Sequence, residues 1–189
     1  TGTVLGTAGA GIVVIAVLSG LSDFQYTSGD YEKSVRTYSG NTLAKVALLR
    51  ETDSKDEMRA LAEDMIADNA YIAVAYSARA RAEFSEGDIG SFIEDKLKAI
   101  ELAPYQYEEY TDYLEILAYC QNEYIKDGKL EDAQICAERA AEIPVMLKEL
   151  QKKTSPLGWK IDDRPQVTLS QADIELIEEM EPLVDGMED

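Results

Sequence analysis

The sequence predicts an all-α fold built from helical hairpins, and two observations support this. Apolar residues recur at helical spacing from Leu18 to about Leu150, and almost no stretch alternates as a strand would. Glycine and proline in this span are confined to regularly placed breaks. We therefore expect a right-handed α-α superhelix, a solenoid of about three to four stacked hairpins that ends in an irregular C-terminal cap.

The first kind of break is a glycine turn. Gly29, Gly87 and Gly128 each stand where one apolar helical pattern ends and the next begins. Glycine readily takes the left-handed conformation that ends a helix. Asp30 and Asp88 follow the first two glycines and are suited to cap the next helix.

The second kind of break is a proline at the end of a hairpin. Pro104 and Pro144 follow helical segments, and proline is unfavourable within a helix. We therefore predict that helices end at these two residues. The interval from Gly29 to Gly87 is too long for one hairpin, so we expect a degenerate unit with helices near 42–50 and 55–67.

This order of helix, glycine turn, helix and proline resembles the tetratricopeptide repeat (TPR) family. The resemblance rests on two runs of residues: Tyr76, Ala80, Glu83, Gly87, Asp88, Phe92, Ala99 and Pro104, then Leu117, Tyr124, Gly128, Leu130, Ala133, Ala137 and Ala140. It implies hairpins over residues 23–153, each of which buries one face against its neighbours.

Composition limits the function. The chain has 189 residues and carries 18 basic against 37 acidic residues, a formal net charge of −19. Such a charge repels nucleic-acid phosphates and anionic lipids. The sequence contains no histidine, and its two cysteines lack metal-binding spacing, so we expect neither a metal site nor a cofactor.

Residues 1–22 form an apolar segment without a charge before Asp23. Two interpretations stay open for it. It is either the outer end of a transmembrane helix, in a sequence that is a fragment or a processed product, or a buried first helix. The glycine-rich, charge-free composition favours the membrane interpretation.

Residues 154–189 are expected to form a C-terminal capping segment and a helix. Ser170 and Asp173 resemble a capping box that opens a helix near 171–180. We expect four apolar residues to fold back over the end of the array: Trp159, Ile161, Val167 and Leu169.

No catalytic motif is found in the sequence. Its adjacent acids, such as Glu108 and Glu109, are those of exposed helix faces, and no phosphate-binding or nucleophile motif is present. We therefore predict that this chain is not an enzyme. The alternative is an acid-pair glycan-processing enzyme on a helical scaffold, which would need a cleft with two facing carboxylates and raised pKa values.

Cys120 and Cys136 lie at equal distances from the Gly128 turn, so an antiparallel hairpin would place them at the same level along the two helix axes. A disulfide between them is a candidate in an oxidising compartment. The preferred interpretation is two small buried thiols.

Tyrosine is abundant, with eleven residues, and aromatic side chains at a groove can receive a peptide or stack on sugars. Ordinary packing explains most of these tyrosines. For groove binding we select five residues: Tyr76, Arg79, Glu83, Tyr113 and Gln121.

A narrower resemblance rests on the stretches 69–76, 87–88, 96–105, 108–113 and 157–165. Together they resemble the extracytoplasmic C-terminal repeat domain of O-antigen ligase/polymerase-like membrane proteins. The resemblance implies a domain at the extracytoplasmic face of the cell membrane, in a protein of cell-surface polysaccharide assembly. It places the glycan chemistry in membrane parts outside this chain.

The sequence therefore predicts a non-catalytic interaction or scaffold domain that binds a protein, a peptide or a glycan, with a membrane link through its N-terminal segment. The rival interpretations are a soluble cytoplasmic TPR adaptor without a membrane link and the acid-pair enzyme.

Overall fold

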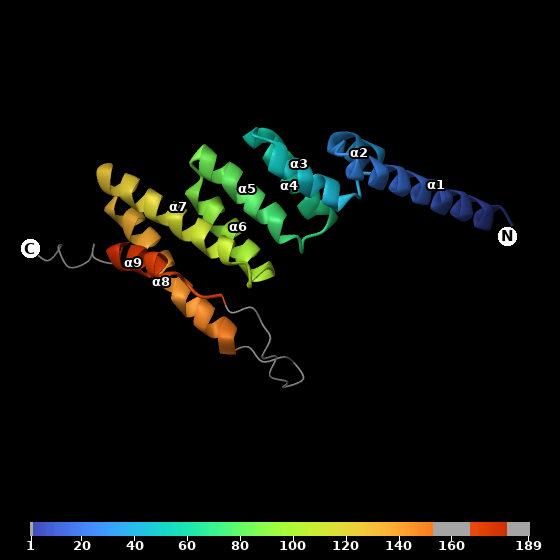
Figure 1. Ribbon diagram of the computed structural model, residues 1–189. Coiled ribbons are helices and arrows are strands. Elements are labelled where there is room, and N and C mark those ends of the chain that lie inside the picture. Colours follow the sequence, from blue (N-terminus) through green and yellow to red (C-terminus); the bar gives the residue numbers. More distant parts are fainter. Residues whose placement is uncertain (1, 153–166, 181–189) are drawn as a thin grey trace, which may run out of the picture. The chain divides into compact units, whose positions relative to one another are not determined.

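The computed structural model describes residues 2–152 and 167–180, with side chains described from 14 to 150 and from 167 to 180. Within these ranges the chain forms nine helices and no strand, which confirms the all-α fold (Figure 1). The helices are α1 (Gly2–Thr27), α2 (Tyr31–Thr37), α3 (Thr42–Glu51), α4 (Lys55–Asp68), α5 (Ala73–Glu86), α6 (Ile89–Leu102), α7 (Tyr107–Lys126), α8 (Leu130–Lys152) and α9 (Gln171–Met180).

The chain divides into two compact units, Thr1–Asp95 and Lys96–Asp189. The boundary falls inside α6, so the first unit holds α1 to the start of α6 and the second holds the rest.

In the first unit, helices that follow one another along the chain pack together. A buried polar cluster joins the first three. The Ser22 and Ser34 hydroxyls lie 2.8 Å apart, and the Asn41 amide donates to Ser22 Oγ at 3.0 Å. The hydroxyls of Ser22 and Ser34 and the amide of Asn41 satisfy one another, so these polar side chains can be buried where α1 and α2 approach closely.

The apolar core of the first unit lies among α3, α4 and α5. It consists of Leu49, Ala62, Met65, Ala75 and Ala78. Alanine at three of these positions lets the helix axes approach closely, and α4 and α5 pack along each other. The helices expected near 42–50 and 55–67 are therefore confirmed as α3 and α4.

The three predicted glycine turns are also confirmed. Gly29, Gly87 and Gly128 have φ angles of 79°, 83° and 73°, and no other described residue has positive φ. Asp30 caps α2 by accepting from the Lys33 amide, and Asp88 accepts from the Ser91 amide at 3.1 Å. Local sequence therefore determines where these helix pairs reverse.

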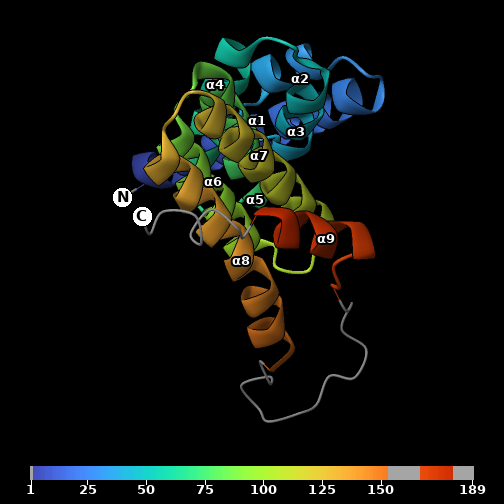
Figure 2. The ribbon, with the colours of Figure 1, turned by 90° about the vertical axis from the view of Figure 1, so that its left-hand side faces the viewer.

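The second unit is built on the hairpin of α7 and α8, and α9 packs on both helices (Figure 2). Its core side chains are Tyr110, Tyr113, Leu114 and Leu117 from α7, with Ala133, Cys136, Ala140 and Ile143 from α8.

The prediction that a helix ends at Pro144 is wrong. α8 continues through Pro144 to Lys152. Proline removes one backbone hydrogen bond from a helix. Ile143, Leu147 and Leu150 are buried on both sides of Pro144, and this packing keeps the chain helical despite that loss.

The C-terminal helix begins and ends as predicted, at Gln171 and Met180. The capping box is confirmed: the Ser170 amide donates to Asp173 Oδ2 at 2.7 Å, and the Asp173 amide donates to Ser170 Oγ at 3.2 Å. Val167 is buried, whereas Trp159 and Ile161 lie outside the described residues.

The segment 1–22 lies within α1, and its first thirteen side chains lie outside the described residues. Farther along α1, six apolar side chains are largely exposed: Val14, Ile15, Val17, Leu18, Leu21 and Phe24. Among the described residues, no helix meets both the length and the apolarity that crossing a membrane requires.

Candidate functional site

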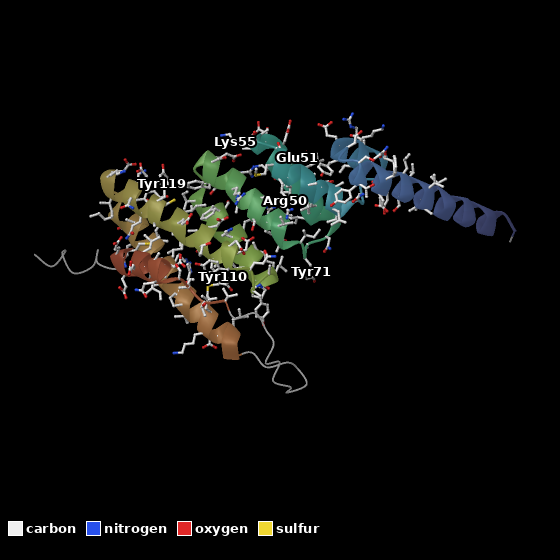
Figure 3. The ribbon with its side chains drawn as sticks, viewed as in Figure 1. Arg50, Glu51, Lys55, Tyr71, Tyr110 and Tyr119 are labelled. Atoms are coloured by element: carbon white, nitrogen blue, oxygen red, sulfur yellow. The ribbon has the colours of Figure 1, made fainter. Side chains whose placement is uncertain are left out.

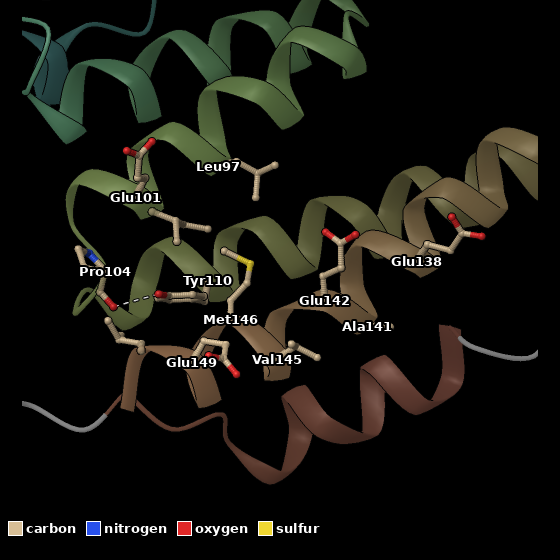
Figure 4. Close-up of a pocket in the computed structure, with 12 residues that line it drawn as sticks. Leu97, Glu101, Pro104, Tyr110, Glu138, Ala141, Glu142, Val145, Met146 and Glu149 are labelled. Carbon is tan, nitrogen blue, oxygen red and sulfur yellow. Dashed lines mark hydrogen bonds between the residues drawn. The ribbon is translucent and has the colours of Figure 1, made fainter. Parts of the chain in front are cut away.

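A groove of about 590 Å³ opens in the second unit between the end of α6, the start of α7 and the middle of α8 (Figure 4). Its lining residues are Leu97, Ile100, Glu101, Pro104, Tyr110, Glu138, Ala141, Glu142, Val145, Met146, Glu149 and Leu150. The volume lies within the range of ligand-binding clefts.

One wall of the groove is a face of α8. Residues 138, 141, 142, 145, 146 and 149 recur at intervals of three and four, so they share this face. Ala141, Val145 and Met146 form its apolar strip, and Val145 is 58% exposed although it is aliphatic. The strip therefore presents apolar surface to solvent at Val145, while Ala141 and Met146 are partly exposed.

The opposite wall comes from α6 and the turn after it. Leu97 and Ile100 line this side, and Pro104 follows them. The buried Tyr110 forms part of the lining, and its hydroxyl donates to the Pro104 carbonyl at 3.0 Å (Figure 4). This bond fixes the turn against α7 and keeps the wall in place.

The charged residues among those that line the groove are all glutamates: Glu101, Glu138, Glu142 and Glu149. Lys98 contacts Glu101 at 2.7 Å, and Arg139 contacts Glu142 at 3.0 Å. Each pair is exposed and lies within a single helix, α6 for the first and α8 for the second. Such exposed pairs neutralise only part of the negative charge of the glutamates. The groove therefore combines an apolar base with a negative rim.

A second hollow, of about 580 Å³, lies in the first unit near the Gly29 turn. Three of its four lining acids, all except Glu51, have local roles that the structure shows. Asp30 caps α2, Glu32 pairs with Arg36, and Glu57 accepts from the Thr52 hydroxyl at 2.9 Å. These roles are structural, so the hollow carries no binding hypothesis.

Three of the five predicted binding residues lie on α5. Arg79 makes two hydrogen bonds to the Asp95 carboxylate, from Nε at 2.5 Å and from Nη2 at 2.8 Å. Its guanidinium lies 5.5 Å from the ring centre of Tyr76. Glu83, one turn further along, is 5% exposed. The structure thus brings Tyr76, Arg79 and Glu83 together as a mostly buried ionic cluster.

Glu83 is the most perturbed carboxyl of this cluster. Burial, reinforced by the nearby Asp95, raises its pKa from 4.5 to about 7, although Arg79 and Arg59 oppose the shift. Its Oε2 atom has no hydrogen-bond partner among the described residues. Asp95 and Glu83 both lie near Arg79, but neither acid lines either of the hollows described above.

The other two predicted binding residues lie on α7 and are also internal. Tyr113 is fully buried, which raises its pKa. Gln121 is buried and its amide donates to the Met180 carbonyl at 2.8 Å, which ties α9 to α7. Binding by these five residues stays a prediction. By contrast, Tyr71 and Tyr119 are exposed (Figure 3).

The two cysteines are free thiols, and both are buried. Burial raises the pKa of Cys136 to about 12, and the neighbouring Cys120 adds to the shift. Thiols held in this protonated state are poor nucleophiles. This arrangement agrees with the preferred interpretation of two buried thiols.

Two buried lysines were missed by the sequence analysis. The Lys45 side chain is 2% exposed and contacts Asp64 and Asp68, each at 2.6 Å. The Lys96 side chain is equally buried and contacts Glu109 at 2.6 Å. Asp64 and Asp68 stand one turn apart on α4. Because that spacing is also common on exposed helix faces, the sequence held no specific signal that Lys45 would be buried.

No group of acids or cysteines in the described parts of the chain is arranged to hold a metal ion. The prediction that Glu108 and Glu109 are exposed helix-face acids is wrong for Glu109, whose side chain is 12% exposed and pairs with the buried Lys96. Glu108 is exposed.

The chain matches no protein-family model, no curated protein and no solved structure. The resemblances to tetratricopeptide repeats and to O-antigen ligase/polymerase-like proteins therefore stay predictions from the sequence.

Proposed function

We propose that this chain is a non-catalytic interaction domain, a TPR-like array of helical hairpins that binds a polypeptide partner. The observation that carries the proposal is the groove of α6, α7 and α8, whose α8 wall carries an apolar strip that is exposed to solvent at Val145. Exposed apolar surface in a concave site is typical of a binding function.

The repeat architecture is supported by the local geometry. α5 with α6, and α7 with α8, each reverse at a left-handed glycine, as paired helices of a repeat do. Several small residues that carry the TPR resemblance are buried, among them Ala80 in the first unit and Ala99, Ala133 and Ala140 in the second. Small buried residues let paired helices pack closely.

A direct test is a peptide-display selection against the immobilised chain 1–189, followed by measurement of selected peptides in solution. We expect peptides that bind with one-to-one stoichiometry and a Kd below about 100 μM, in the range of transient recognition. A diverse library that yields no saturable binder would overturn the proposal.

We further propose that the domain acts at the extracytoplasmic face of a membrane, in a protein of cell-surface polysaccharide assembly. Support comes from the charge-free residues 1–22, the exposed aliphatic residues of α1 and the sequence resemblance. The chain should float with neutral lipid vesicles, and Val14→Asp with Val17→Asp should reduce flotation. Flotation that is absent, or that the double variant leaves unchanged, would favour the soluble adaptor.

A further inference from the structure

The helical walls of the groove of α6, α7 and α8 indicate the conformation of its ligand. Both walls are helices, whose interior backbone groups are already hydrogen-bonded to one another. An extended peptide would therefore find no free strand edge on which to add itself. A ligand that satisfies its own backbone, as a helix does, fits these walls better.

The groove also fits a helix in length. The α8 face from Glu138 to Glu149 spans about 16 Å at 1.5 Å per residue. A helix of about three turns covers that distance. The side chains at intervals of three and four form a ridge, against which the ridges of another helix can interlock. Met146 can adjust its shape to different apolar partners.

Charge gives the ligand its second property. Four glutamates border the apolar strip, and the charged residues of the lining include neither lysine nor arginine. A ligand with acidic flanks would be repelled at short range, whereas lysine or arginine beside its apolar face would find a carboxylate within reach.

From these observations we propose that the groove of α6, α7 and α8 binds a basic amphipathic helix of about three turns, with its apolar face on the strip of Ala141, Val145 and Met146 and its basic residues against the rim glutamates. This inference rests on the proposed interaction function and specifies the class of partner.

The test uses the full chain and a synthetic peptide of about 14 residues, in which leucines form one helical face and lysines the rest. Two control peptides separate the requirements. One has the same composition in strict alternation, which favours a strand, and the other replaces every lysine by glutamate. Fluorescence anisotropy at about 150 mM salt should show saturable binding of the leucine–lysine helix, at least about tenfold tighter than either control.

Matched variants of the chain locate the site. Val145→Asp places a charge on the strip, and I135D, at an exposed position of α8 outside the groove, is its control. Glu138→Lys with Glu149→Lys reverses the rim, and E178K/E179K makes the same change in net charge on α9. All of these positions are exposed, so circular dichroism should show intact helices.

We expect each groove variant to weaken binding at least about tenfold and each control variant to change it less than about twofold. Equal losses of affinity in groove and control variants would show that the basic peptide is attracted to the acidic protein in general, which would overturn the inference. Peptide binding that all variants leave unchanged would also overturn it, while the proposed interaction function would stand. Failure of the leucine–lysine peptide to bind overturns the inference alone, because the display selection tests the function independently.

Discussion

Lys45, Arg79 and Glu83 are ionisable side chains removed from solvent to a large extent, and neighbouring opposite charges offset the cost of burial to different degrees. Burial alone would lower the pKa of Lys45, but Asp64 and Asp68 outweigh it and the pKa is raised. Arg79 is likewise held by Asp95. For Glu83 the two arginines do not outweigh burial, and its pKa rises. Glu83 is therefore the member of this set whose charge changes near neutral pH.

Glu83 should make the stability of the first unit depend on pH. Its folded pKa of about 7 lies above the ordinary value of 4.5, so between these values the folded state binds more protons than the unfolded state. The free energy of unfolding therefore falls as pH rises through this window, by an amount on the order of 1–3 kcal/mol from this group. Below about pH 4.5 the stabilisation is complete, and above about pH 7 it is lost.

The measurement is urea denaturation of the native chain and of Glu83→Gln at a series of pH values from 4.5 to 8. Glutamine keeps the shape and cannot ionise, so the variant should gain stability relative to the native chain as pH rises. A difference between the two proteins that stays constant across the series would show that Glu83 does not titrate in this window.

Asn41 should contribute more than an ordinary helix cap. Its side-chain oxygen accepts from the Ala44 amide at 3.2 Å, and its amide donates to Ser22 and Ser34. Asn41→Ala removes the cap and leaves buried hydroxyls with fewer partners, so we expect a loss of about 2 kcal/mol in denaturation experiments. Ser54→Ala, which removes only the exposed cap of α4, should cost about 1 kcal/mol. Equal losses would show that the polar cluster adds nothing.

At the scale of elements, glycine turns and capping side chains predicted helix ends correctly, whereas proline did not at Pro144. The ends at Gly29, Gly87 and Gly128 and the start at Ser170 follow from backbone and side-chain chemistry within a few residues. The passage of α8 through Pro144 depends on packing with residues distant in sequence, which a local rule cannot weigh.

The candidate site was harder to predict than the helices, for the same reason. Tyr76, Arg79 and Tyr113 have side chains typical of binding surfaces, yet tertiary packing buries both tyrosines and leaves Arg79 only partly exposed, paired with Asp95. The groove strip of Ala141, Val145 and Met146 carries no unusual residue. Its importance comes from its exposure on α8 within the described part of the chain, and exposure is a property of the tertiary structure.

The glycine turns allow a matched test within one hairpin. Gly87 has a φ of 83°, where a Cβ atom is strained even without a clash, so Gly87→Ala should lower stability by about 1 kcal/mol. Gly90 lies in α6, and an added Cβ would meet only Asp88 at an ordinary 3.7 Å. Gly90→Ala should therefore raise stability by about 0.5–1 kcal/mol. Thermal unfolding of both variants checks the opposite signs, and a shared sign would contradict the assigned turn geometry.

At the scale of the whole molecule, the dominant property is an excess of acidic over basic residues, 37 against 18. Many of the ion pairs in the described residues are exposed, such as Glu32 with Arg36 and Glu123 with Lys126. Exposed pairs contribute about 0–1 kcal/mol each, and repulsion among the remaining acids opposes folding. Net repulsion should therefore outweigh the gain from surface pairs.

This balance predicts that salt stabilises the chain. Raising NaCl from about 20 mM to about 500 mM shortens the screening length several-fold. This weakens repulsion between separated acids more than it weakens contact within a largely buried pair such as Lys96 with Glu109. We expect the unfolding midpoint to rise by about 3–6 °C, equivalent to about 1–2 kcal/mol, in a thermal scan. The variant E178K/E179K carries less excess charge, because each change adds two positive charges to the net −19, and should show a smaller rise. A midpoint that falls with salt in both proteins would mean that attractive pairs, rather than acidic repulsion, dominate the electrostatics of this fold.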